Sequence, residues 1–140
     1  MELPPAELQD FAARYTAAWC SRNAASVAAC YSPTGSLTIN EGAPAVGRSA
    51  ITEVAQSFMT AFPDMRVAMD DIVMQDGLAH YHWTLTGTNT GPGGAGRRVR
   101  ISGFEIWQIG VDGLIADSQG QFDSAEYRRQ MECGVEEPKQ

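Results

Sequence analysis

The sequence predicts an α+β domain in which three N-terminal helices pack on one face of a curved antiparallel sheet, followed by a short C-terminal helix. Two observations support this prediction. Up to Phe62, apolar residues recur at spacings of three and four, as on a helix. From Met65 onward, β-branched and aromatic stretches alternate with turn signals, as in a meander of hairpins. With no repeat and no linker, the 140 residues form one domain, 1–140.

The helices follow from their apolar faces. The first helix has a stripe made of Leu8, Phe11, Ala12, Tyr15, Ala18 and Trp19. A second, short helix is predicted over 24–31, with Asn23 as its cap. A short strand at 36–40 and a loop at 41–47 come next. The third helix ends at Pro63-Asp64, and its apolar face holds Ile51, Val54, Ala55, Phe58 and Phe62.

The second half of the chain is predicted to be strand, over 65–75, 78–91, 97–110 and 114–122. The turn signals between them are Asp76-Gly77, Gly91–Gly96 and Asp112-Gly113.

The last helix is predicted to start after Asp123. Good helix formers follow at 124–131, and Glu126 completes the D-x-x-E form of a capping box. We therefore interpret Asp123 as a helix cap and not as a catalyst.

Composition limits the partners. A net charge of −7 argues against nucleic acid, and no apolar run approaches the ~18 residues of a membrane span. The N-terminus lacks a basic-then-apolar signal, which predicts a cytoplasmic protein. Three cysteines without paired spacing favour reduced thiols. His80 and His82 have no neighbouring ligand cluster, so we expect neither a metal nor a cofactor.

Glu105 is the leading candidate site residue. It interrupts an apolar strand, and a buried carboxyl must either be paired or have a raised pKa. An ion pair with Arg48 or Arg66 is the alternative to a place in a pocket. Tyr15 is the second candidate, because a buried tyrosine hydroxyl needs a partner. Further candidates for ligand contact are Trp19, Asn40, His82, Trp107 and Ser118. For Trp19 and His82, a purely structural role is the alternative.

The stretches FPDMRV, YHWTLTGTNTGPGGAGRRVRISGFEIWQI and DGLI resemble the nuclear transport factor two-like superfamily. Within it, the chain is similar to the SnoaL-like polyketide cyclases and the ketosteroid isomerases. The resemblance spans about residues 6–131 and implies a cone-shaped fold with an apolar cavity.

The resemblance also implies roles for individual residues. Tyr15 falls on the tyrosine of the isomerases that donates to the substrate oxyanion, and Glu105 falls on their protonated aspartic acid. Ketosteroid isomerase is itself the standard example of such a neutral acid. The isomerase base falls on Ile39, Asn40 or Glu41, and only Glu41 is a competent base. The position of the cyclase base is Gly120.

The resulting expectation is a cofactor-independent enzyme that performs isomerisation, dehydration or cyclisation by proton transfer on a small hydrophobic carbonyl or polycyclic compound. A non-catalytic ligand-binding protein of the same fold is the main alternative, and a dimeric interaction domain is another. Apolar residues on both faces of SGFEIWQI further predict a homodimer formed through the outer face of the sheet.

Overall fold

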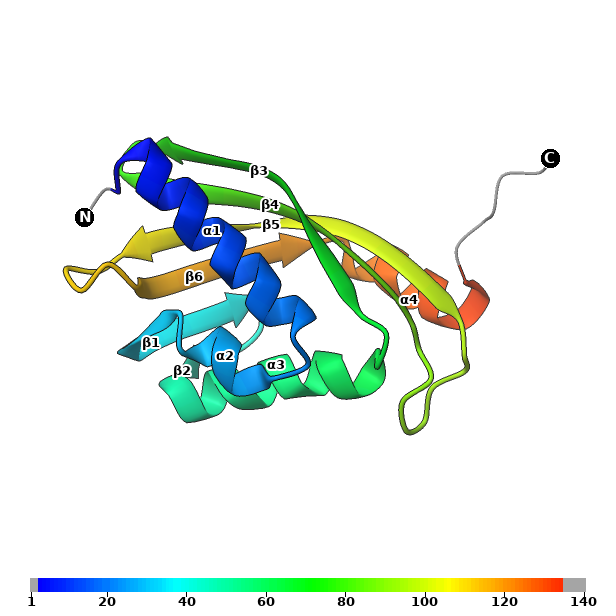
Figure 1. Ribbon diagram of the computed structural model, residues 1–140. Helices are drawn as coiled ribbons and strands as arrows, with labels where there is room; N and C mark the ends of the chain where they lie inside the picture. Colours follow the sequence, from blue (N-terminus) through cyan, green and yellow to red (C-terminus); the bar gives the residue numbers. More distant parts are fainter. Residues whose placement is uncertain (1–2, 135–140) are drawn as a thin grey trace.

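The computed structural model describes residues 3–134, and Figure 1 shows helices gathered against one curved sheet. The elements run in the order α1 (Pro5–Cys20), α2 (Ala24–Ala28), β1 (Tyr31–Ile39), β2 (Ala45–Val46), α3 (Arg48–Ala61), β3 (Arg66–Gln75), β4 (Leu78–Thr88), β5 (Arg98–Ile109), β6 (Ile115–Phe122) and α4 (Ser124–Cys133). The prediction of an α+β domain with three helices before the meander is confirmed.

The sheet has six strands in the order β2-β1-β6-β5-β4-β3. All neighbouring strands are antiparallel except β1 and β6, which are parallel, so the sheet is mixed and not purely antiparallel as predicted. Three hairpin turns separate β3 from β6, so these two strands run in opposite directions. Because β1 runs parallel to β6, β1 and β3 also run in opposite directions.

The region around β1 differs from the prediction. The short helix ends at Ala28, and β1 already begins at Tyr31, whose side chain is fully buried. The guanidinium of Arg48 donates to the Tyr31 carbonyl oxygen from Nε at 3.0 Å and from an Nη atom at 2.8 Å. Pro33 is accommodated because the β1–β6 register shifts between Tyr31 and Ser36, at the kind of irregularity where strands tolerate proline.

Helix α1 lies across one face of the sheet, and α2 and α3 lie beside β1 and β2 (Figure 1). Helix α4 lies past the end of β6. The predicted stripe of α1 is buried in full, and α3 buries Ile51, Ala55 and Met59. On the strands, odd-numbered residues of β4 and β5 face inward, among them Tyr81, Glu105 and Trp107. Within residues 3–134, no helix has the length and apolar character that crossing a bilayer requires.

Asp123 caps α4, as predicted. Its Oδ1 accepts a hydrogen bond from the backbone N–H of Glu126 at 3.0 Å. The reciprocal half of the predicted capping box does not form, because the Glu126 carboxylate binds Arg129 and Gln130 instead. The buried Gln130 then accepts from the backbone N–H of Arg100 at 2.7 Å, which fastens α4 to β5.

Candidate functional site

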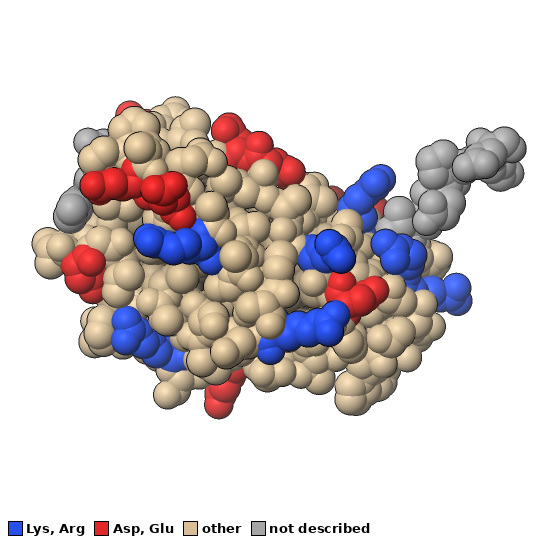
Figure 2. All heavy atoms as spheres, in the orientation of Figure 1, with Lys and Arg blue, Asp and Glu red and all other residues tan. Residues whose placement is uncertain are grey.

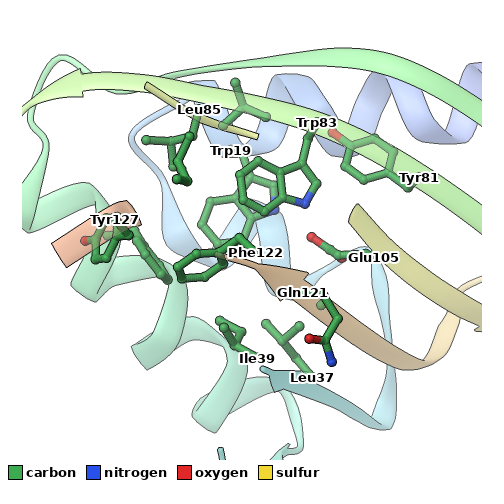
Figure 3. A pocket seen from close by; sticks show the side chains of 14 residues that line it. Trp19, Leu37, Ile39, Tyr81, Trp83, Leu85, Glu105, Gln121, Phe122 and Tyr127 are labelled. Atoms are coloured by element: carbon green, nitrogen blue, oxygen red, sulfur yellow. The ribbon is translucent and has the colours of Figure 1, made fainter. Parts of the chain in front are cut away.

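An apolar cavity lies between the inner face of the sheet and the helices (Figure 3). Trp19 of α1, Phe58 of α3 and Tyr127 of α4 contribute to its walls. The strands supply the rest of the lining, namely Leu37, Ile39, Val67, Tyr81, Trp83, Leu85, Ile101, Glu105, Gly120, Gln121 and Phe122. The cavity offers about 60 Å³ to the centre of a water-sized sphere, several times the ~10–15 Å³ that one water needs. This space holds a small organic group, and because the cavity is partly open to solvent, a larger ligand can extend beyond it.

Among residues 3–134, Glu105 is the one carboxyl group that lines this cavity. It sits on the inner face of β5 with 8% of its surface exposed. Its Oε1 accepts three hydrogen bonds, from the Tyr15 hydroxyl at 2.8 Å, the Trp107 indole Nε1 at 2.9 Å and the Ser118 hydroxyl at 2.8 Å. All three donors meet on Oε1, none of the described hydrogen bonds uses Oε2, and the side chain of Glu105 lines the cavity (Figure 3).

The ionisation of Glu105 is perturbed. Burial raises the pKa of Glu105 above its ordinary value, and the hydrogen bonds from Trp107, Ser118 and Tyr15 oppose this without cancelling it. Neither Arg48 nor Arg66, the predicted alternatives for an ion pair, is among its hydrogen-bond partners. When Glu105 is neutral, its proton belongs on Oε2, because Oε1 is already surrounded by donors. The group can then donate a proton into the cavity, and its ionised form can accept one.

Tyr15 lies behind Glu105 and outside the cavity lining. Its side chain is fully buried, and its hydroxyl bonds to Glu105 and, at 2.9 Å, to the hydroxyl of Tyr31. Burial, followed by the charge of Glu105, holds the pKa of Tyr15 well above its usual range. Tyr15 and Glu105 therefore lie side by side, as predicted. Direct donation from Tyr15 to a ligand oxygen is not supported, since the Tyr15 hydroxyl already donates to Glu105.

Trp107 and Ser118, both predicted as ligand contacts, are also fully buried, and each donates a hydrogen bond to Glu105. The indole of Trp107 stacks on Tyr81, with ring centroids 4.8 Å apart, and meets the edge of Tyr15. These contacts hold the donors in place. Trp19 differs from them, because it does line the cavity.

Three other predicted residues lie elsewhere. Asn40 has a φ of 54°, the left-handed turn conformation that asparagine tolerates, and its Oδ1 accepts from the Phe122 backbone N–H. Glu41 follows in the same turn, is exposed and does not line the cavity. His82 points to the outer face of β4, opposite Phe104, because its even position puts it on the other side of the strand from Glu105's partner Tyr81.

Sequence reasoning missed Trp83, Tyr127 and Phe122. Trp83 shares the inner face with Tyr81, and it pairs with Gly103 on β5. A side chain at Gly103 would collide with the indole, since an added Cβ would lie 2.6 Å from Trp83 Cζ2. A tryptophan opposite a glycine on paired strands is a signal that the sequence contains, but it becomes visible only with the strand register.

Charge is dispersed outside the cavity. On the face shown in Figure 2, arginines are separated by uncharged surface and interspersed with acidic residues, and they form no continuous basic band. In the part of the chain that the structure describes, no three His, Cys, Asp or Glu side chains come together as a metal site would require.

Solved structures support the architecture. A proposed SnoaL-like polyketide cyclase from Jannaschia sp. CCS1 superposes with a TM-score of 0.79 at 12% identity, over 96% of this chain and 99% of that one. TsrD from Streptomyces laurentii matches with a TM-score of 0.79 at 22% identity, over 93% and 98%. AclR, a proposed hydroxylase from Streptomyces galilaeus, matches with a TM-score of 0.76 at 19% identity, over 97% and 91%. At these identities the similarity establishes the fold.

No protein of curated function matches the sequence. The sequence model of the SnoaL-like domain matches residues 12–118, which is most of the chain and includes the part of α1 that holds Tyr15 and the strand that bears Glu105. The chain therefore belongs to the SnoaL-like domain family.

Proposed function

We propose that this protein is a cofactor-independent enzyme that moves a proton within a small hydrophobic carbonyl compound, with Glu105 as the group that carries the proton. The observation behind this proposal is the asymmetry of the Glu105 carboxyl. Three donors converge on Oε1, none of the described hydrogen bonds uses Oε2, and Glu105 lines the cavity. A carboxyl with a raised pKa is a better base than an ordinary one, and its neutral form is a better match for donation near neutral pH.

A single carboxyl of this kind is sufficient for a proton shift next to a carbonyl. In its ionised form, Glu105 takes a proton from a carbon beside the carbonyl, and the C–H electron pair moves into a carbon–carbon double bond while charge develops on the oxygen. The now neutral Glu105 then returns the proton to another carbon of the conjugated system, and the charge on the oxygen moves back into the carbonyl double bond. Each proton taken is returned, so these two steps need no second reactant and no cofactor. Isomerisation is therefore the favoured reaction among the three expected.

The cavity is suited to an uncharged substrate. Its lining is mostly aliphatic and aromatic, and none of the lysines or arginines in the part of the chain that the structure describes belongs to it. An anionic ligand would lose its hydration without gaining an opposite charge, which is costly in an apolar site. Glu41 and Gly120, the positions of the expected bases, supply no carboxyl to the cavity. Glu105 therefore acts both as the base that takes the proton and as the acid that returns it.

Deuterium exchange tests the proposal without knowledge of the natural substrate. 2-Tetralone, a bicyclic ketone with acidic C–H bonds, is incubated with the protein in D₂O, and deuterium uptake is followed by mass spectrometry. We expect the wild type to accelerate uptake and Glu105→Gln, which keeps the size of the side chain, to lose the acceleration. A folded Glu105→Gln variant that exchanges as fast as wild type would refute the role of Glu105.

A non-catalytic ligand-binding role is the second candidate. It is favoured by the cavity lining, in which the described residues supply a single carboxyl where a base and a separate acid were expected. Under this alternative, 2-tetralone binds to the wild type but gains deuterium no faster than in buffer.

A further inference from the structure

The indole nitrogen of Trp83 is a buried donor without a partner. Among the buried side-chain nitrogen and oxygen atoms of residues 3–134, Trp83 Nε1 is the one that makes no hydrogen bond. A buried N–H left unpaired loses its hydration without compensation, and buried indole N–H groups usually find a partner. The other tryptophan of the inner strand face, Trp107, follows this rule by donating to Glu105.

The strand register places Trp83 beside Glu105. Trp83 pairs with Gly103 across β4 and β5, and Glu105 lies two residues further along the same face of β5. Such diagonal neighbours lie roughly 7–8 Å apart, with their Cβ atoms somewhat closer, which is within the reach of long side chains. Gly103 lets the indole lie against β5, where Cζ2, adjacent to the ring carbon that is bonded to Nε1, would be 2.6 Å from a Cβ. Both side chains line the same cavity (Figure 3).

We infer that Trp83 Nε1 binds the carbonyl oxygen of the ligand and thereby selects neutral ring compounds that present one acceptor oxygen beside Glu105. This inference rests on the proposed function and names the substrate class of the same site. The aromatic walls around this donor, Trp19, Phe58, Phe122 and Tyr127, suit a ring system. When Glu105 takes the proton from carbon, the charge that develops on the oxygen strengthens its hydrogen bond with Trp83.

A pair of probes tests the inference by binding alone. 2-Tetralone and tetralin have the same ring skeleton, but only the ketone has an acceptor oxygen. Affinities for both are measured by isothermal titration calorimetry with wild type, Trp83→Phe and Trp19→Phe. The Trp19→Phe variant is the matched control, because it makes the same truncation in another wall of the cavity.

We expect Trp83→Phe to lower the preference for 2-tetralone over tetralin by about tenfold. We expect Trp19→Phe to leave this preference unchanged. An unchanged preference in Trp83→Phe would overturn the inference and would mean that the N–H is satisfied by water. Failure of 2-tetralone to bind to wild type at millimolar concentration would overturn it as well.

A second measurement on the wild type covers the case in which Trp83→Phe does not fold. The protein has three tryptophans, and the indole N–H signal of Trp83 can be assigned by ¹⁵N labelling. 2-Tetralone should move this signal downfield and tetralin should not, whereas equal shifts with both probes contradict the inference. Neither measurement depends on turnover, so loss of deuterium exchange with an intact ketone preference would count against the proposed function alone.

Discussion

The Tyr15 hydroxyl lies 2.8 Å from Oε1 of Glu105 and donates to it from behind the cavity wall. The residue that a resemblance to isomerases would place against the substrate thus donates to the carboxyl that lines the cavity. Tyr15 is a positioning residue in this arrangement, together with Trp107 and Ser118. The distinction can be tested, because removing a positioning donor alters the ionisation of Glu105.

Replacing Tyr15 by Phe should raise the pKa of Glu105 further, since the hydrogen bond from Tyr15 is one of those that lower it. The pH midpoint of 2-tetralone exchange should therefore move upward, with a loss of about 1–3 kcal/mol in the free energy of unfolding. Tyr31→Phe is the control, because Tyr31 bonds to Tyr15 and not to Glu105. An unshifted midpoint in Tyr15→Phe would leave Tyr15 with a structural role only.

The stability of the wild type should fall, relative to Glu105→Gln, as pH rises. Burial raises the pKa of Glu105 in the folded state, so the unfolded chain ionises first. The contribution of Glu105 is fully present below its ordinary pKa, decreases above it and levels off beyond the raised pKa. Melting temperatures of both proteins from pH 4 to 9 measure this effect, and a pH-independent difference would contradict it.

A larger side chain at Gly120 should block the cavity without harming the fold. A Cβ there would meet Glu105 Cγ and the Thr38 carbonyl oxygen at 3.5 Å, which is ordinary contact. We expect Gly120→Leu to abolish 2-tetralone binding and to leave the melting temperature close to that of wild type. At Gly35, by contrast, a Cβ would lie 2.8 Å from the Ile115 carbonyl oxygen, so Gly35→Ala should lower the melting temperature.

Changing Asp123 to Asn should cost little stability, and changing it to Ala should cost about 1 kcal/mol, because asparagine also caps helices well. Urea denaturation measures both effects. Exchange of 2-tetralone should be retained in Asp123→Asn, since Asp123 does not line the cavity. Loss of exchange in this variant at an unchanged melting temperature would mean that Asp123 acts as a base.

A homodimer through the outer face of the sheet remains a prediction. The half-buried Phe104 and Ile106 lie on this face of β5, beside Gln119 and Gln121 of β6. Light scattering at micromolar concentration should give twice the 15.1 kDa mass of the chain, and Ile106→Lys should reduce it. The mass of a single chain for wild type would refute the prediction.

The sequence predicts those parts of the molecule that depend on local periodicity. The stripe of α1 and the burial of Glu105 could both be read from spacing, because a helix or strand buries its apolar face wherever it packs. The extension of β1 back to Tyr31 could not, because it depends on a bulge and on contacts with Arg48 from another element.

The candidate site depends on register as well as on periodicity. His82 and Trp83 are adjacent in sequence and point to opposite faces of β4. A one-residue error in the predicted register would therefore place His82 on the inner face and Trp83 on the outer face. The pairing of Tyr81 with Glu105 decides which residues of β4 face the cavity. That pairing depends on how many residues the glycine-rich loop at 91–96 takes up. Likewise, Tyr15 was identified, but the fact that its hydroxyl is used by Glu105 is a property of the packed structure.

The pH dependence of 2-tetralone exchange tests the central claim most directly. If Glu105 carries the proton, the exchange rate above that of buffer should rise with pH through the raised pKa of Glu105 and then level off. The midpoint should coincide with the titration of the Glu105 carboxyl carbon followed by ¹³C NMR. A rate that increases with hydroxide without levelling off, or a midpoint that persists in Glu105→Gln, would contradict the account.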